Sequence, residues 1–371
     1  MALVGILLLG AVGVIGYLQQ PLFGDLPSGE RLARNERSPN YADGAFYNQI
    51  DTPMRTTNQS ELSMWMQTLF GEKGQVRPPG TIATAKTDLN ALNPTQDLVI
   101  WLGHSSYFVQ LSGKRILIDP VFSTNAAPVP GAVRAFNGTS IYTAQDMPEI
   151  DALLISHDHY DHLDYPSIKT LKPKVRQVVA GLGMGAHFAT WGYDPGIVSE
   201  VDWYDAMKLT PELRIHITPA RHFSGRTFKR DQSLWVGFAL VSPQRRIFFS
   251  GDSGYAPHFT EIGRRFGPFD WVTVDTGQYD PRWANVHMNP EQAAQAAEDL
   301  QAKALTPGHV GRFSIAPHDW DDPFKRIVTA SRGRNYALWT PKIGQPVYLD
   351  GRAQSFTAWW ESGGMAEGKA K

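Results

Sequence analysis

A chain of 371 residues is longer than most single domains and fits one large catalytic domain with an extension. Apolar residues make up 42% of the chain and charged residues 19%, which excludes a largely disordered protein. The net charge of −1 and the isoelectric point near 6.8 provide no broad cationic field and argue against a nucleic-acid partner. Because cysteine is absent, disulfides and thiolate ligands are excluded, and imidazole and carboxylate groups must hold any transition metal.

The first twenty residues contain an uncharged apolar run, Ala2 to Leu18. Its length lies at the lower limit of the roughly 17 to 25 residues that span a bilayer. No Lys or Arg precedes Arg31, and no clear cleavage site follows the run, so we interpret residues 1–20 as a retained membrane anchor rather than a secretory signal. The side of the membrane stays undecided, although the cations that follow favour a cytoplasmic body: Arg31, Arg34 and Arg37.

Residues 21–96 are rich in Pro, Gly, Asn and Ser, and only Glu61 to Gly71 shows helical spacing. We therefore expect an extension wrapped over a main domain of residues 97–350, followed by a C-terminal tail of residues 351–371. The main domain is predicted to open with an antiparallel meander of strands at Leu98 to Leu102, Tyr107 to Leu111 and Arg115 to Ile118.

Strands and helices then alternate, which indicates an α/β protein. Further strands are predicted at Val175 to Val179, Leu213 to Thr218, Trp235 to Val241, Ile247 to Ser250 and Trp271 to Val274. Helices are predicted at Tyr165 to Leu171, Met184 to Trp191, Pro257 to Phe266 and Pro290 to Leu300, the last with Asn289 as its cap.

A loop rich in metal-binding side chains follows the apolar run Ala152 to Ile155. It reads Ser156-His157-Asp158-His159-Tyr160-Asp161-His162. Because side chains at i and i+2 of an extended segment point the same way, His157 and His159 can bind one ion. Asp161 and His162 can then bind a second ion. A solvated turn would explain any one of these residues, but the cluster as a whole predicts metal.

Three further candidate ligands come shortly after predicted strands or in a Gly-rich turn, where catalytic groups tend to sit. They are His222, Asp252 and His309. In the arrangement we expect, His157, His159 and His222 bind one ion, Asp161, His162 and His309 bind the other, and Asp252 bridges the two. The spacing favours core or surface roles for His187, His216 and His258 and leaves His318 undecided.

With these residues in place, the chain resembles the metallo-β-lactamase superfamily, in particular N-acyl-phosphatidylethanolamine-hydrolysing phospholipase D and its bacterial relatives. The resemblance covers about Leu98 to Asp322. It rests on the metal loop, His222 and several short motifs: Trp101-Leu102-Gly103-His104, Ile118-Asp119-Pro120, Phe248 to Tyr255, Gly267 to Asp270, Tyr279 to Trp283 and His287 to Glu291. It implies an αββα sandwich with two divalent ions, usually zinc, at the sheet edge, although Mn or Fe could occupy the same ligands.

Other residues receive expected roles from this chemistry. Asp161 would orient a hydroxide shared by the two ions, and His287 would donate a proton or bind phosphate. His104 and Asp119 are candidates for orienting the ligands, with a purely structural hydrogen bond as the alternative. One departure from the phospholipase, Val310-Gly311-Arg312-Phe313, is interpreted as placing a cation near the mouth of the site.

The expected function is therefore a membrane-associated phosphodiesterase that hydrolyses N-acyl-phosphatidylethanolamine or a related phospholipid. A lactone or carboxylic-ester hydrolase is the main alternative, because the same hydroxide can attack a carbonyl carbon. A non-catalytic scaffold is disfavoured, since the buried ligand set is costly without metal. A nuclease is disfavoured by the near-neutral net charge and the apolar N-terminus. A homodimer stays open.

Overall fold

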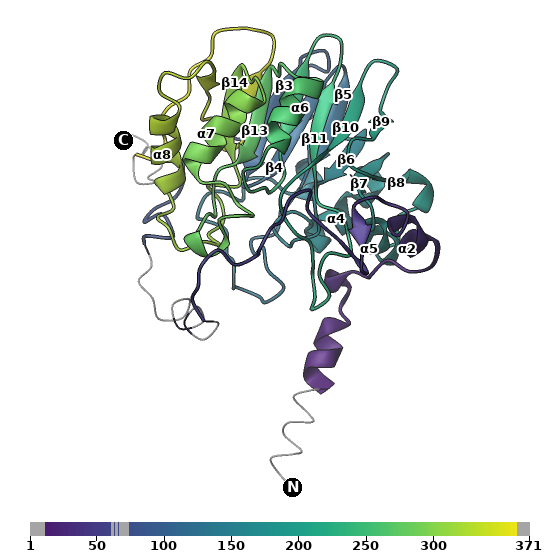
Figure 1. Ribbon diagram of the computed structural model, residues 1–371. Helices are drawn as coiled ribbons and strands as arrows, with labels where there is room; N and C mark the ends of the chain where they lie inside the picture. Colours follow the sequence, from purple (N-terminus) through teal and green to yellow (C-terminus); the bar gives the residue numbers. More distant parts are fainter. Residues whose placement is uncertain (1–11, 61–62, 64–65, 67–73, 362–371) are drawn as a thin grey trace.

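Two seven-stranded sheets stack face to face in the computed structural model, which describes residues 12–60, 63, 66 and 74–361 (Figure 1). The first sheet has the strand order β16-β3-β4-β5-β6-β7-β8. Its strands are β3 (Leu98–Gly103), β4 (Ser106–Leu111), β5 (Lys114–Ile118), β6 (Ala152–Ile155), β7 (Val178–Gly181), β8 (Val198–Val201) and β16 (Pro346–Tyr348). The order confirms the predicted meander at the start of the main domain.

The second sheet has the strand order β15-β14-β13-β12-β11-β10-β9. Its strands are β9 (Ala206–Lys208), β10 (Arg214–Pro219), β11 (Val236–Val241), β12 (Arg246–Phe249), β13 (Trp271–Asp275), β14 (Ala304–Gly308) and β15 (Ala337–Leu338). A small hairpin of β1 (Tyr41–Ala42) and β2 (Ala45–Phe46) lies in the extension.

Successive side chains of each strand point to opposite faces of its sheet. The two sheets therefore form three apolar layers, one between them and one on the outer face of each. Val99, Trp101 and Leu154 face the second sheet and pack with its Phe238 and Trp271 in the central layer. The neighbouring side chains on each strand point to the opposite face, as the two-residue period of a strand requires.

Helices cover both outer faces. The outer face of the first sheet packs against α4 (Tyr165–Leu171) and α5 (Gly185–Thr190). The outer face of the second sheet packs against α6 (His258–Phe266), α7 (Pro290–Asp299) and α8 (Asp322–Ala330). The layers therefore run helix, sheet, sheet, helix, which confirms the expected αββα sandwich.

Asn289 caps α7 as predicted: its side chain accepts a hydrogen bond from the Gln292 backbone N–H, with Pro290 at the first helical position. The strand predicted from Val175 to Val179 begins three residues later, at Val178. The cause is a 3₁₀ turn over Lys172–Lys174, which leaves Val175 with a single isolated bridge to Ile150.

The extension contacts the sandwich through α2 (Gly29–Asn35) and through buried Phe23, Phe46, Ile82 and Leu89. The helix predicted at Glu61 to Gly71 lies for the most part outside the described residues. At the other end, Trp359 and Trp360 are buried against Phe324 of α8.

Residues 12–18 are helical and extend away from the sandwich (Figure 1). The described part of the chain contains no helix whose length and hydropathy would let it cross a membrane. The apolar run from Ala2 begins in residues that lie outside the description.

Removing Leu154 side-chain atoms tests the central layer, because this fully buried residue joins the two sheets just before the metal loop. We expect Leu154→Ala to lower the free energy of unfolding by about 2 to 5 kcal/mol in urea denaturation. Lys208→Ala, at an exposed position in β9, should change it by less than about 0.5 kcal/mol. Equal effects of the two substitutions would contradict the assignment of Leu154 to the core.

Candidate metal centre

Every expected ligand follows the carboxyl end of a strand. In the first sheet, β5 and β6 pair in parallel, and the metal loop begins directly after β6. In the second sheet, β12, β13 and β14 are parallel to one another, and β10 runs in the same direction because both β10 and β12 pair antiparallel with β11. His222, Asp252 and His309 follow β10, β12 and β14 respectively, so the two rigid sheets bring distant parts of the sequence to one edge.

The first donor group consists of three imidazoles. His159 Nδ1 lies 2.9 Å from His157 Nε2 and 3.3 Å from His222 Nε2. One nitrogen from each ring lies close enough to share a single ion. His157 and His222 are buried, whereas His159 is half-buried. The structure thus brings together the three histidines predicted for the first ion.

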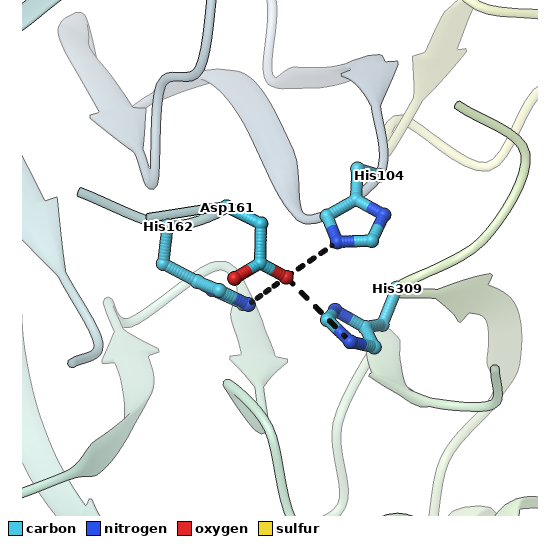
Figure 2. Close-up of side chains that lie close together, drawn as sticks. All are labelled: His104, Asp161, His162 and His309. Carbon is cyan, nitrogen blue, oxygen red and sulfur yellow. Dashed lines mark hydrogen bonds and ion pairs between the residues drawn. The ribbon is translucent and has the colours of Figure 1, made fainter. Parts of the chain in front are cut away.

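The second donor group surrounds the Asp161 carboxylate (Figure 2). Asp161 Oδ2 lies 2.9 Å from His104 Nε2, 3.6 Å from His162 Nε2 and 3.9 Å from His309 Nε2. His104 was expected only to support the ligands, but its Nε2 lies inside this group. The three predicted ligands Asp161, His162 and His309 thus lie together, and His104 Nε2 hydrogen-bonds the Asp161 carboxylate among them.

Asp252 connects the two groups. Its Oδ2 faces the first group, 3.8 Å from both His157 Nε2 and His222 Nε2. Its Oδ1 faces the second group, 3.1 Å from His162 Nε2 and 3.0 Å from His309 Nδ1. Two oxygens of one carboxylate thus point at separate sets of nitrogens, as the bridging role predicted from the sequence requires.

The polar atoms of the centre fit a cation better than they fit one another. Although His162 Nε2 and Asp252 Oδ1 are buried and close, neither makes a hydrogen bond of normal geometry. Burial and the neighbouring imidazoles hold the pKa of His157 and that of His309 well below the usual range, so these rings are neutral, the form that binds metal. A set of imidazoles and carboxylates without cysteine suits zinc, manganese or iron.

Neighbouring groups fix the orientation of the ligands. Asp119 Oδ2 accepts a hydrogen bond from His162 Nδ1 at 2.8 Å, and Asp119 Oδ1 accepts one from the Ser156 backbone N–H at 2.8 Å. His222 Nδ1 donates to the Val286 carbonyl at 3.0 Å, which leaves Nε2 free to face the donor group. A carboxylate or carbonyl behind the imidazole is the usual arrangement for a metal-binding histidine. The expected supporting role of Asp119 therefore has a geometric basis.

The backbone is strained at three residues of the centre. His104, Asp119 and His309 have φ values of 55°, 41° and 58°, in the left-handed region that residues other than glycine rarely adopt. Such conformations persist where surrounding contacts over-determine them, and they concentrate at functional sites. Here they turn the chain sharply at the strand ends and aim the side chains inward.

His287 lies beside both donor groups and is paired with a carboxylate that the sequence interpretation missed. Its Nδ1 lies 2.7 Å from Asp275 Oδ2, and its ring stacks on His309 at 5.2 Å. Burial raises the pKa of Asp275 to about 7, whereas Asp275 raises the pKa of His287 against the effect of burial. Asp275 ends the buried strand β13, and the strand-end rule that identified Asp252 could have found it.

The remaining histidines take structural roles. His187 Nε2 lies 3.3 Å from Asp158 Oδ2, so Asp158 is the one carboxylate of the metal loop that points away from the centre. His258 is buried beside Ser253, and His216 packs on Phe266. His318, undecided from the sequence, accepts a hydrogen bond from the Gln278 backbone N–H.

The interpretation of Arg312 as a cation at the mouth of the site is wrong. Its side chain is 1% exposed, lies over the Phe313 ring and donates to the carbonyls of Leu102 and Ser123. Burial lowers the pKa of its guanidinium to about 10. Arg312 therefore ties the loop after His309 to the first sheet.

This geometry agrees with comparisons against known proteins. The sequence model of the β-lactamase superfamily domain matches residues 114–310, and the chain belongs to that superfamily. Igni18, a metallo hydrolase of Ignicoccus hospitalis, has the same fold, with a TM-score of 0.54, 21% identity and coverage of 68% of this chain and 98% of Igni18. The protein is a metal-dependent hydrolase of the metallo-β-lactamase superfamily.

Three relatives add detail. An uncharacterized protein of Mycobacterium tuberculosis is 36% identical over 334 residues, which cover 88% of this chain and 89% of the relative. N-acyl-phosphatidylethanolamine-hydrolyzing phospholipase D 1 of Caenorhabditis elegans is 30% identical over 256 residues, 62% of this chain and 69% of the relative. Outer membrane protein RomA of Klebsiella pneumoniae is 55% identical over 101 residues, 27% of this chain and 76% of the relative.

Asp252→Ala tests the bridge, because the substitution removes an oxygen from both donor groups at once. We expect bound metal, measured by elemental analysis after dialysis, to fall from about two equivalents to about one or fewer. His216→Ala removes a histidine that packs on Phe266 rather than in the centre and should leave the metal content unchanged. Full metal content in Asp252→Ala would contradict the bridging role.

Proposed function

We propose that the protein is a dinuclear phosphodiesterase that hydrolyses N-acyl-phosphatidylethanolamine or a related phospholipid. The proposal rests on the Asp252 carboxylate, which faces two imidazoles of the metal loop, His157 and His162, and two further histidines that follow strands of the second sheet. The similarity to the Caenorhabditis elegans phospholipase supports the choice of substrate class.

Two divalent ions held by these residues would supply a nucleophile at neutral pH and neutralise the charge that develops on a phosphodiester. The chain itself supplies the orientation. Asp161 is fixed by His104 at 2.9 Å, and Asp119 fixes His162 at 2.8 Å, so the donors are positioned before substrate arrives. Preorganised groups of this kind need no rearrangement during the reaction.

His287 is the proposed proton donor to the leaving oxygen. Its Nδ1 is held by Asp275, so Nε2 is the nitrogen that remains for the substrate. Asp275 raises the pKa of His287, which favours the protonated imidazole that a proton donor requires. Asp275 acts through His287 and is a positioning residue.

A lactone or carboxylic ester is the alternative substrate, because the same donor set can serve attack on a carbonyl carbon. We favour the phospholipid because of a feature that lies outside the metal centre. The helical residues 12–18 extend from the body and expose Val12, Val14 and Ile15, each by more than half. An apolar arm of this kind would keep the centre near lipid, in agreement with the predicted anchor.

The substitution His287→Ala tests whether His287 donates a proton or binds metal. The second role needs testing because His287 also lies within reach of His222 and Asp252. We expect kcat to fall roughly 10²- to 10⁴-fold, the usual contribution of general acid catalysis, while metal content stays at the wild-type level. Loss of metal together with activity would instead identify His287 as a ligand. Asp275→Asn should also lower kcat, and it should leave KM unchanged.

The substrate proposal is tested with metal-loaded protein on N-acyl-phosphatidylethanolamine and on a panel of lactones. Wild type is expected to release phosphatidic acid, and Asp252→Ala, which serves as the blank, is expected to release none. Lactone opening by wild type without lipid cleavage would refute the phosphodiesterase and assign the centre to carbonyl hydrolysis.

A further inference from the structure

A second apolar feature lies outside the metal centre, in the loop of residues 225–230. Phe228 is 89% exposed, the largest exposed fraction among the large apolar side chains of the described residues. Thr227, Lys229 and Arg230 beside it are also exposed. Exposing a phenylalanine to water is unfavourable, and an exposed aromatic side chain followed by two cations suits the boundary between lipid and water.

This loop lies against the N-terminal arm, which here means residues 12–26. Arg226, at the base of the loop, donates from Nε and Nη2 to the Leu22 carbonyl at 3.1 and 2.6 Å. A cavity of about 190 Å³ separates the two segments and is lined by Leu18, Leu26 and Lys229 among others. The loop and the arm are therefore neighbours on one side of the molecule.

A third segment, which contains Pro128 and Val129, contacts the arm. The Tyr17 hydroxyl donates to the Pro128 carbonyl at 2.6 Å, and the next residue, Val129, is 56% exposed. A wider cavity of about 1110 Å³ lies between this segment and Arg226. We name the exposed apolar side chains of the three segments the docking face: Val12, Val14, Ile15, Leu26, Val129 and Phe228.

We propose that the docking face binds the surface of a lipid bilayer, with Phe228 inserted among the lipids and Lys229 and Arg230 against anionic headgroups. Aromatic side chains at the membrane boundary and cations beside them are the chemistry that an anionic bilayer recognises. Arg134 adds a third exposed cation near Val129, whereas Asp25 is the exposed acid of the arm.

Two observations favour a bilayer over a second protein. The apolar sequence of the arm continues without charge from Leu18 back to Ala2, so further apolar residues adjoin the docking face in the sequence. The exposed side chains also sit on three separate projecting segments rather than on one flat patch. A fluid lipid surface accommodates separate insertions, whereas a protein interface needs a packed, complementary surface.

The docking face connects to the metal loop through short contacts. The Tyr160 hydroxyl donates to the Arg226 carbonyl at 2.6 Å, and the Arg226 guanidinium lies over the Tyr160 ring. The Phe223 ring contacts that of His159 at 4.5 Å. A bilayer bound by the loop of residues 225–230 would therefore lie close to the metal centre, whatever substrate the centre hydrolyses.

The chain has no cysteine, so a single introduced thiol can be labelled uniquely with an environment-sensitive fluorophore. Full-length metal-loaded Phe228→Cys and Glu212→Cys are labelled and mixed with vesicles of equal parts phosphatidylcholine and phosphatidylglycerol. Glu212 is the matched control, because it is exposed in the turn before β10, at the opposite end of that strand from His222. We expect a blue shift and a severalfold rise in emission at position 228 and no change at 212.

Charge reversal gives a second readout. Lys229→Glu combined with Arg230→Glu should weaken the vesicle response of the 228 probe by roughly fivefold for each cation removed. Lys208→Glu combined with Arg214→Glu changes the net charge equally at the far end of the sheet and should leave the response unchanged.

Two results would overturn the inference. One is a 228 probe that stays as water-exposed as the 212 probe on vesicles. The other is a shift at 228 that grows with protein concentration when no vesicles are present, which would assign the docking face to a second copy of the chain. Neither result depends on the substrate of the metal centre.

Discussion

The arrangement of the centre depends on one carboxylate that two sets of imidazoles share. Asp252 sits between nitrogens of both donor groups, and all of these atoms are largely withdrawn from water. Burying so many polar groups is unfavourable unless something satisfies them, and the buried nitrogens and oxygens here make too few hydrogen bonds to do so. Two cations bound on either side of Asp252 would resolve this imbalance.

The fold makes the arrangement possible because it places strand ends, rather than whole strands, at the centre. The apolar layers between and outside the sheets hold the strands rigidly, and the ligands begin where the layers end. Left-handed backbone at His104, Asp119 and His309 then turns the side chains inward. The buried residues of the strands therefore stabilise the fold, whereas the residues that follow the strands bind the metal. Substitutions in these loops can alter the chemistry without disturbing the sandwich.

Local pattern predicted a large part of this architecture, and its failures have physical causes. Metal binding by the loop that contains His157 and His162 could be predicted from the spacing of residues within that loop. The position of Asp252 could be predicted because it follows a buried strand. Strand β14 was missed because Pro307 weakens the strand pattern, although the strand pairs in parallel with β13. The direction of the Arg312 side chain could not be deduced, because burial against Leu102 and Ser123 depends on contacts about two hundred residues away.

The most direct test of the central claim is anomalous diffraction from crystals of the metal-loaded protein, collected at the absorption edge of the bound element. We expect two peaks separated by about 3.5 to 4 Å, with an Asp252 oxygen directed at each. One peak, or two peaks of which only one lies beside Asp252, would contradict a centre built on a shared carboxylate.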